Sequence, residues 1–302
     1  MTMRGAAIAV ALAAASAALS GQTIRTRVDL VRVDALVTRS GVPIANLRAS
    51  DFELRDNGVL QTIDRVSLET LPLSVTLTLD TSASVSGRKR DRLISAAATA
   101  VDNLRPPDRA TLITFSHHVL ERAVPALDAG AVRRLLEARQ PYGGTSLYDA
   151  VYAALVSADA HDARPLVLVF SDGEDTASWL APAAALRTAR HADAVVYGVV
   201  VPDHFGPPLI AHGDPRPIYT REQTTFLEET ASITGGRVVR VDAVDNLPKM
   251  FAAILREFRT RYLITYYPRG VDTPGWHAIE VKLTRLRGDV RARRGYARAG
   301  SD

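Results

Sequence analysis

Hydrophobic and polar residues follow two different periods along the chain, and the period changes twice. Residues 22–69 alternate with a period of two and show no helical period, which predicts β-strands. Within them, the tripeptide Asp56-Asn57-Gly58 predicts a tight hairpin turn. Residues 261–298 return to the same alternation. The strands expected there are 262–267, 277–283 and 290–296.

Between these segments, short apolar runs alternate with amphipathic helical patterns. The expected helices are 87–104, 132–138, 147–156, 183–191, 222–233 and 247–258. The expected strands are 73–79, 110–115, 166–170, 195–201 and 237–241, with 119–124 pairing back as an edge. This alternation predicts an α/β domain over residues 71–258, with a doubly wound, mostly parallel sheet and helices on both faces.

The two flanking segments are too short to fold alone, because a few strands need a partner face. We therefore expect residues 22–69 and 261–298 to pack together as one small β-domain interrupted by the α/β domain. The alternative is that each segment adds its strands separately to the main sheet.

The N-terminus has the three-part pattern of a secretory signal peptide. Arg4 provides a positive charge, residues 6–19 form an unbroken run of small and apolar residues, and small residues lead up to Ser20. The run is shorter than the roughly 20 apolar residues that span a bilayer, which disfavours a membrane anchor. We expect residues 1–20 to be a cleaved signal peptide and the mature protein to be periplasmic or extracellular, without a transmembrane segment.

Composition narrows the possible chemistry. Hydrophobic residues make up 47% of the 302 residues and charged residues 23%, which excludes wholesale disorder. The formal net charge of +4 is small for this length, so nucleic acid is not an expected partner. The chain has no cysteine, which excludes disulfides, zinc–thiolate sites and a cysteine nucleophile.

Short oxygen-bearing side chains follow the ends of several expected strands. Asp80, Ser82 and Ser84 come directly after the first strand of the α/β domain, and a carboxylate with two hydroxyls suits a hard cation such as Mg²⁺ or Mn²⁺. Alone, this spacing more often marks a turn or a helix cap. Thr145 precedes another helix, and Asp172 follows the most hydrophobic strand. Because the carboxyl ends of parallel strands meet at one edge, we expect these residues to lie close together.

The order Asp-x-Ser-x-Ser, a later Thr and a later Asp resembles the metal-ion-dependent adhesion site of von Willebrand factor type A (VWA) domains. The resemblance covers about residues 71–258 and implies a Rossmann-like fold. The flanking segments, with Asp51-Phe52 and Arg294-Gly295-Tyr296, are similar to those of a VWA-related family of exported bacterial proteins.

The resemblance also implies how the cation would be held. Ser82, Ser84 and Thr145 would touch it directly or through water, while Asp80 and Asp172 would supply charge, at least one of them through water. Mg²⁺ is the expected cation, with Mn²⁺ or Ca²⁺ as the alternatives. One coordination position would stay open for the acidic side chain of a partner protein.

Residues 202–221 form a long segment with five prolines after an expected strand. Loops of this length inside compact domains are usually functional, so we expect it to form one wall of the partner site. The candidate aromatic anchors are Tyr142, Trp179, Phe205 and Tyr219. The alternative is a variable insertion with no contact role.

The C-terminal segment is basic. Its charged residues include Lys282, Arg285, Arg287, Arg291, Arg293, Arg294 and Arg298. A solvated strand face is the simplest interpretation, and attachment to anionic lipid or an envelope polymer is the alternative.

Three functions are compatible with these patterns. The first is an exported, metal-dependent protein-binding module for adhesion or assembly, which is not an enzyme. The second is a metal-assisted hydrolase, because an open metal position can activate water. A hydrolase also needs a general base, and the sequence has no Glu or His at a motif spacing that supplies one, nor a G-x-S-x-G, H-E-x-x-H or P-loop motif. The third is a structural envelope protein with a vestigial metal site.

Overall fold

A computed structural model describes residues 30–68, 71–124, 128–158, 162–171, 175–200, 221–241 and 243–298. The expected signal peptide at 1–20, the predicted ligand Asp172 and the proline-rich segment at 202–220 lie outside the described residues.

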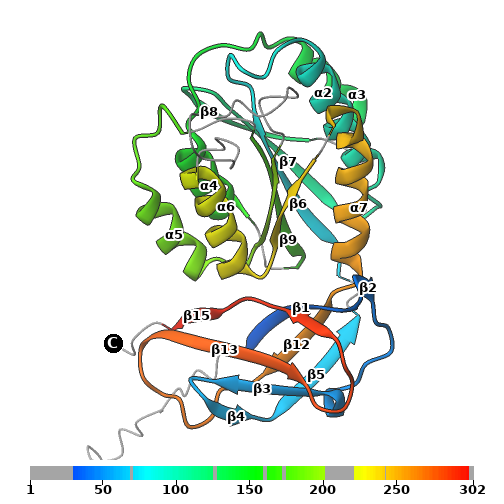
Figure 1. The fold of residues 1–302 in the computed structure, drawn as a ribbon, viewed down its shortest axis with the longest axis vertical. Helices are drawn as coiled ribbons and strands as arrows, with labels where there is room; N and C mark the ends of the chain where they lie inside the picture. The colour runs from blue at the N-terminus through cyan, green and yellow to red at the C-terminus, as the bar shows by residue number, and fades with distance from the viewer. Residues whose placement is uncertain are drawn as a thin grey trace, which may run out of the picture.

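The centre of the molecule is a six-stranded sheet in the order β11-β10-β9-β6-β7-β8 (Figure 1). Its strands are β6 (Leu73–Asp80), β7 (Arg109–Phe115), β8 (Val119–Ala123), β9 (Arg164–Ser171), β10 (Val195–Val200) and β11 (Arg237–Arg240). The neighbours from β11 to β7 pair in parallel, and β8 pairs antiparallel with β7 at the edge, as expected. The α/β class predicted from the alternating pattern is confirmed.

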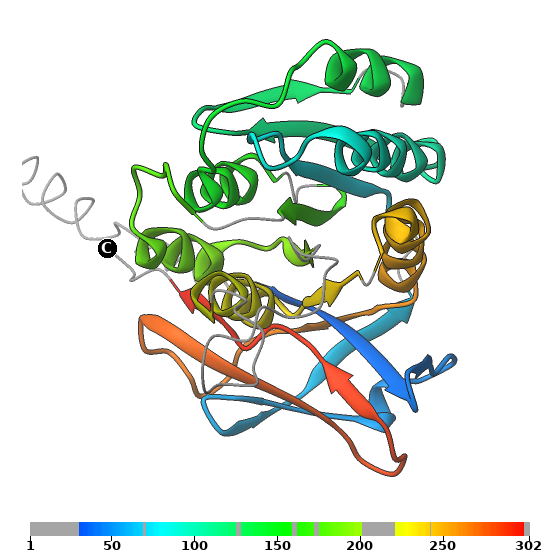
Figure 2. The same cartoon turned by 45° about the horizontal axis from the view of Figure 1, so that its top comes forward.

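Helices cover both faces of this sheet (Figure 2). They are α2 (Gly87–Asp102), α3 (Ala129–Glu137), α4 (Leu147–Ser157), α5 (Pro182–His191), α6 (Arg221–Thr234) and α7 (Leu247–Arg259), with a short 3-10 turn η3 (Val244–Asn246) before α7. The first group, α2, α3 and α7, packs against one face, and α4, α5 and α6 pack against the other. Within the described part of the chain, no helix is long and apolar enough to cross a membrane.

The centre of strand β9, residues 166–170, is continuously apolar. All eight residues of the strand are buried. Leu168 and Phe170 belong to the core beneath α2 and α7, while Val167 and Val169 belong to the core beneath α4 and α5. Successive side chains point to opposite faces, so a strand covered on both sides needs apolar residues at every position.

The two ends of the described chain form two further sheets below the first (Figure 1). Their strands are β1 (Val31–Arg39), β2 (Val42–Pro43), β3 (Phe52–Asp56), β4 (Val59–Gln61), β5 (Ile63–Leu68), β12 (Tyr262–Tyr266), β13 (Gly275–Leu283), β14 (Asp289–Arg291) and β15 (Gly295–Arg298), and a 3-10 turn η1 (Ala49–Asp51) precedes β3. One sheet has the order β14-β1-β12-β5, with β2 on β1, and the other has the order β15-β13-β3-β4. Each sheet therefore contains strands from both ends of the described chain, and in the first sheet they alternate. Their shared core includes Val33, Leu54 and Ile264.

The predicted hairpin at 56–58 is confirmed, and one predicted strand is wrong. Strands β3 and β4 are joined by Asn57 and Gly58, whose φ angles of 47° and 81° are the left-handed values that such a turn requires. Residues 290–296 do not form one strand, because β14 pairs with β1 while β15 pairs with β13.

The break between β14 and β15 follows from the burial of Arg293. This side chain is 8% exposed and donates to the carboxylate of Asp193 at 2.9 Å and to the carbonyl oxygens of Ala192 and Gly295 at 3.2 and 2.7 Å. A buried guanidinium needs such acceptors. The chain bends to reach groups on the α/β unit, and the strand stops.

Two buried arginines join the β-sheets to the α/β unit. Arg164, the first residue of β9, forms an ion pair with Asp34 of β1, and its Nε lies 3.2 Å from Asp34 Oδ1. Arg261, directly before β12, donates to the carbonyl oxygens of Asp34 at 2.9 Å and Gly235 at 2.8 Å. Because both guanidinium groups are buried, these contacts fix the relative position of the two layers.

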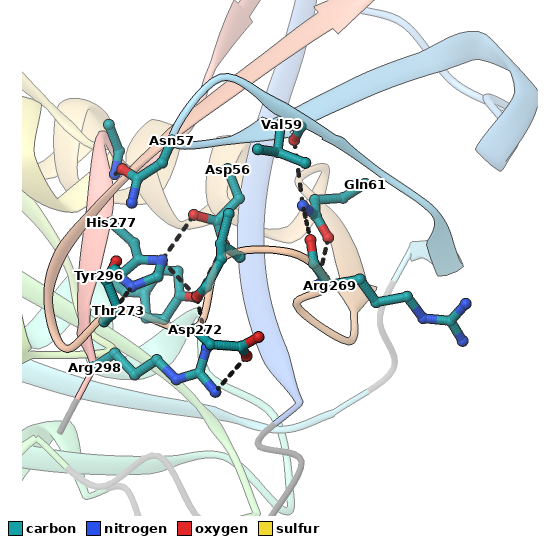
Figure 3. A network of polar contacts seen from close by, with 12 residues as sticks. Asp56, Asn57, Val59, Gln61, Arg269, Asp272, Thr273, His277, Tyr296 and Arg298 are labelled. Atoms are coloured by element: carbon teal, nitrogen blue, oxygen red, sulfur yellow. Dashed lines mark hydrogen bonds and ion pairs between the residues drawn. The ribbon is translucent and has the colours of Figure 1, made fainter. Parts of the chain in front are cut away.

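A second polar cluster lies inside the β-sheets (Figure 3). Asp56 and His277 are both fully buried, and His277 Nδ1 lies 2.9 Å from Asp56 Oδ1. The other ring nitrogen, Nε2, lies 2.6 Å from the carbonyl oxygen of Thr273. A carboxylate and a carbonyl both accept hydrogen bonds, so both ring nitrogens of His277 face acceptors.

Two tyrosines complete this cluster. The hydroxyls of Tyr266 and Tyr296 each donate to Asp56 Oδ2 at 2.9 Å. Burial, followed by the neighbouring Asp56, raises the pKa of both phenols above the usual value, so they remain donors at neutral pH. Asp56 is therefore held by three donors within the core of the β-sheets.

Candidate metal centre

Asp80 ends β6 in a fully buried position. Its Oδ1 accepts the backbone N–H of Ser82 at 2.8 Å, and its Oδ2 accepts the hydroxyl of Ser171 at 2.9 Å. Ser171 is the last residue of β9 and precedes Asp172, which lies outside the described residues. The carboxylate of Asp80 thus joins the carboxyl ends of two neighbouring parallel strands.

The loop after Asp80 presents two hydroxyls side by side. Ser82 Oγ and Ser84 Oγ lie 3.1 Å apart, with Ser82 buried and Ser84 exposed. The N–H of Val85 donates to the carbonyl of Ser82 at 3.0 Å and closes a turn, and the buried side chain of Val85 anchors it in the core. One hydroxyl therefore lies inside the protein and its neighbour at the surface.

A second loop, which carries Thr145, is hydrogen-bonded to the first. The N–H of Ala83 donates to the carbonyl of Gly143 at 3.1 Å, and the N–H of Tyr142 donates to the carbonyl of Thr81 at 3.2 Å. Thr145 is 5% exposed. The structure thus brings the loops of Asp80 and Thr145 together, in agreement with the sequence prediction.

Glycine is required where this second loop is tightest. Gly143 has a φ of +77°, and a Cβ added there would lie 2.2 Å from His117 Nδ1. A Cβ on Gly144 would lie 2.7 Å from Thr176 Oγ1. The two glycines therefore let the backbone before Thr145 pass close to its neighbours.

The chain on the far side of Asp172 is attached to Thr145. The N–H of Thr145 donates to Thr176 Oγ1 at 2.9 Å, and the N–H groups of Thr176 and Ala177 donate to the carbonyl of Thr145 at 2.9 and 3.1 Å. The described chain before Asp172 contacts Asp80 through Ser171, as above. Both described flanks of Asp172 are therefore bonded to residues of the candidate centre.

The donor set fits a hard divalent cation. It offers one buried carboxylate from Asp80 and hydroxyl oxygens from Ser82, Ser84 and Thr145, and Mg²⁺ and Ca²⁺ prefer oxygen ligands. Among the described residues, no three His, Asp or Glu side chains cluster so as to hold a metal ion. A cation at this edge of the sheet would therefore depend on the hydroxyls, together with Asp172.

Two acidic residues that were not predicted as site residues hold the surrounding loops. Asp175 accepts the N–H of Tyr148 at 3.1 Å and the N–H of Ser178 at 3.3 Å, which places its charge at the N-terminus of α4. Asp149, inside the first turn of α4, accepts the N–H groups of Trp179 and Leu180, both at 2.9 Å. Acids near a helix start are favoured by its unpaired N–H groups and dipole, and that signal could have identified Asp149. Asp175 lies 27 positions from Tyr148 and carries no such signal in the sequence.

Two of the four predicted aromatic anchors lie on these loops. Tyr142 is 70% exposed and Trp179 is 94% exposed. The ring of His117 packs edge-on against Tyr142, with ring centroids 5.2 Å apart. Phe205 and Tyr219 lie outside the described residues.

Comparison with known proteins finds similarity to one domain family. A family model for the von Willebrand factor type A domain matches residues 75–174. Inter-alpha-trypsin inhibitor heavy chain H2 of Mus musculus is 26% identical over 143 residues, which are 43% of this chain and 15% of the relative. Heavy chain H4 of Homo sapiens is 30% identical over 139 residues, or 41% and 15% of the two chains. This chain thus spans only a small part of these curated relatives.

The fold comparison agrees. The solved structure of a von Willebrand factor type A protein from Catenulispora acidiphila matches with a TM-score of 0.51 and 11% identity, covering 87% of this chain and 76% of that one. The family match over residues 75–174 includes every residue of the candidate centre. Residues 75–174 of this chain therefore match the von Willebrand factor type A domain family.

Proposed function

We propose that this protein is an exported, metal-dependent protein-binding module that acts in adhesion or assembly. Its cation, Mg²⁺ in the first instance and otherwise Mn²⁺ or Ca²⁺, is held by Asp80, Ser82, Ser84, Thr145 and Asp172. One coordination position stays open for the acidic side chain of a partner protein. The proposed role is binding without turnover.

The observation that supports this proposal most strongly is the set of hydrogen bonds between the three loops. Ser171 donates to Asp80, Ala83 donates to Gly143, and Thr176 donates to Thr145. Each bond joins a different pair of segments that carry proposed ligands. The loops are therefore held together before a cation arrives, which reduces the entropy that binding must offset.

The exposure of Ser84 indicates which side of the proposed site faces solvent. Asp80 and Ser82 are buried beneath the loop, whereas Ser84 faces solvent. A cation held among them would be partly dehydrated on its inner side and accessible on its outer side. The bound cation would attract the carboxylate of a partner protein, since few protein charges neutralise the cation. The exposed rings of Tyr142 and Trp179 would contact the partner around that point.

We also propose the domain organisation expected above, with 1–20 as a signal peptide and 71–258 as a doubly wound domain. In this organisation, 22–69 and 261–298 form one β-domain. The pairing of β1 with β12 and of β3 with β13 supports it, because each sheet takes strands from both ends of the chain.

The proposed cation site is tested by calorimetric titration of the purified protein with Mg²⁺ and Mn²⁺. Ser84→Ala removes an exposed proposed ligand, and we expect affinity at least about tenfold lower, since few protein ligands remain. Ser86→Ala is the matched control, because Ser86 is also exposed in the same loop and makes no side-chain cap bond to α2. Asp80→Asn should abolish saturable binding while circular dichroism shows an intact fold.

Equal affinities for Ser84→Ala, Ser86→Ala and the unchanged protein would contradict the proposed ligand set. Absence of saturable binding to the unchanged protein would contradict a resident cation and favour the vestigial site. Turnover of an ester or phosphoester that requires the cation would favour the hydrolase.

A further inference from the structure

A surface hollow of about 420 Å³ lies where the α/β unit meets the lower sheets. It is lined by α6, the start of β11, β14 and the chain that joins β14 to β15. The lining residues are Glu228, Ser232, Gly236, Arg237, Val238, Val290, Arg291, Ala292 and Arg294. In Figure 2, α6 lies beside this part of the chain. The hollow is at the opposite end of the sheet strands from Asp80, so it is separate from the candidate metal centre.

Two of the charged lining residues are already neutralised. Arg237 pairs with Glu257 at 2.7 Å, and Glu228 pairs with Arg240 at 2.9 Å. Burial alone would raise the pKa of Glu257, but hydrogen bonds from Arg237 and Tyr197 outweigh it, so the carboxyl has a lowered pKa and is ionised at neutral pH. These pairs leave little net charge on that side of the hollow.

The other two arginines have no such neutralisation. Arg291 and Arg294 are both exposed, and the contact of the Arg291 guanidinium is with a carbonyl, that of Gly236 at 3.3 Å. Within the described residues, neither arginine forms an ion pair with a carboxylate. The hollow therefore carries two uncompensated positive charges beside the hydroxyl of Ser232 and an apolar wall at Val238.

The backbone beneath these arginines is fixed. The N–H of Arg294 donates to the carbonyl of Ile233 at 3.1 Å, and the carbonyl of Arg291 accepts from Arg261 at 3.3 Å. The approach is close because a Cβ on Gly235 would lie only 2.5 Å from the backbone nitrogen of Arg293. Only the two side chains must be ordered when an anion binds, which favours affinity.

We propose that this hollow binds a phosphate group through the guanidinium groups of Arg291 and Arg294. Guanidinium offers paired donors that match phosphate oxygens, and two of them can hold one phosphate from two sides. The volume is within the range of about 300–1,000 Å³ that is typical of small-molecule sites. Val238 and Val290 would contact the uncharged part of the ligand. The phosphate belongs either to a small soluble molecule or to a lipid headgroup.

The test compares two double variants with the same charge change. Arg291→Ala/Arg294→Ala removes the proposed site, and Arg285→Ala/Arg287→Ala removes two exposed arginines of the same segment that do not line the hollow. Each full-length protein is titrated with inorganic phosphate and glycerol 3-phosphate, and with phosphatidylglycerol vesicles against phosphatidylcholine vesicles, at constant ionic strength. We expect at least about tenfold weaker binding for the first variant and unchanged binding for the second, as for the loss of charge-assisted bonds.

The soluble and vesicle arms separate the two sources. Saturable binding of glycerol 3-phosphate that depends on Arg291 and Arg294 supports a small ligand, and binding confined to the anionic vesicles with the same dependence supports a headgroup. Equal losses in both double variants would show a general charge effect and overturn the proposal. Binding in neither arm would overturn it as well. Asp80→Asn should leave every result unchanged, because the two sites are separate.

Discussion

Replacing Asp56 by alanine should strongly destabilise the lower β-sheets, because the change leaves the buried groups that hydrogen-bond to Asp56 without their acceptor. Asp56 and His277 are both fully buried, and both ring nitrogens of His277 face acceptors (Figure 3). In the alanine variant, His277 Nδ1 and the hydroxyls of Tyr266 and Tyr296 lose the acceptor that they share.

The expected magnitude follows from these contacts. The change leaves three buried polar groups without their acceptor, and at about 1 kcal/mol or more for each group the unfolding free energy should fall by about 3 kcal/mol or more. Tyr296→Phe removes only one of the three hydrogen bonds to Asp56, so it should cost about 1 kcal/mol. Asp289→Ala is the control, because Asp289 is exposed on β14 and its loss should stay within about 0.5 kcal/mol.

Urea unfolding followed by tryptophan fluorescence provides the assay. Trp276 directly precedes His277 on β13 and is 39% exposed, whereas Trp179 is 94% exposed, so most of the signal change should come from the lower sheets. The reasoning is refuted if Asp56→Ala lowers the unfolding free energy no more than Asp289→Ala does. A cost for Tyr296→Phe that equals the cost for Asp56→Ala would show that His277 does not need the carboxylate.

Two other perturbations test the buried polar groups. Asp34→Ala should lower the unfolding free energy by about 3–5 kcal/mol in the same urea assay, because its ion-pair partner Arg164 is 1% exposed and would lose that partner. A cost near that of replacing an exposed aspartate would contradict this prediction. Burial raises the pKa of Tyr266 and Tyr296 in the folded protein, so their stabilisation is complete below the unfolded pKa of about 10 and is lost as pH rises beyond it. Thermal unfolding between about pH 9 and pH 11 should therefore show a steeper fall for the unchanged protein than for Tyr266→Phe, and parallel curves would count against the raised pKa values.

Local sequence patterns predicted the elements well where neighbouring residues of the same strand or turn determine the structure. The apolar run 166–170 became the centre of β9, and the turn at 56–58 adopted the positive φ angles that its residues favour. The break at 292–294 could not be predicted in this way. It depends on Arg293 reaching Asp193, which lies 100 positions away in the sequence. The alternation of hydrophobic and polar residues contains no information about such a distant partner.

Part of the candidate metal centre was likewise predictable from the sequence, and part was not. Strand ends in a parallel sheet share an edge, so the proximity of the Asp80 and Thr145 loops followed from the order of elements. The bond from Ser171 to Asp80 and the bond from Thr176 to Thr145 were not predicted, because a hydroxyl at a strand end has many alternative acceptors. The ligand roles of the five proposed metal-binding residues, and the contact roles of the four aromatic anchors, stay predictions.

The bond from Ser171 to Asp80 helps to determine how the site would bind a cation. Each oxygen of the Asp80 carboxylate already accepts one donor, from Ser82 on one side and Ser171 on the other, so its orientation is fixed in the fold. The buried hydroxyl of Ser82 lies beside this carboxylate, whereas the hydroxyl of Ser84 is exposed. The fold therefore fixes the inner half of the proposed site, and Ser84 lies on its solvent side.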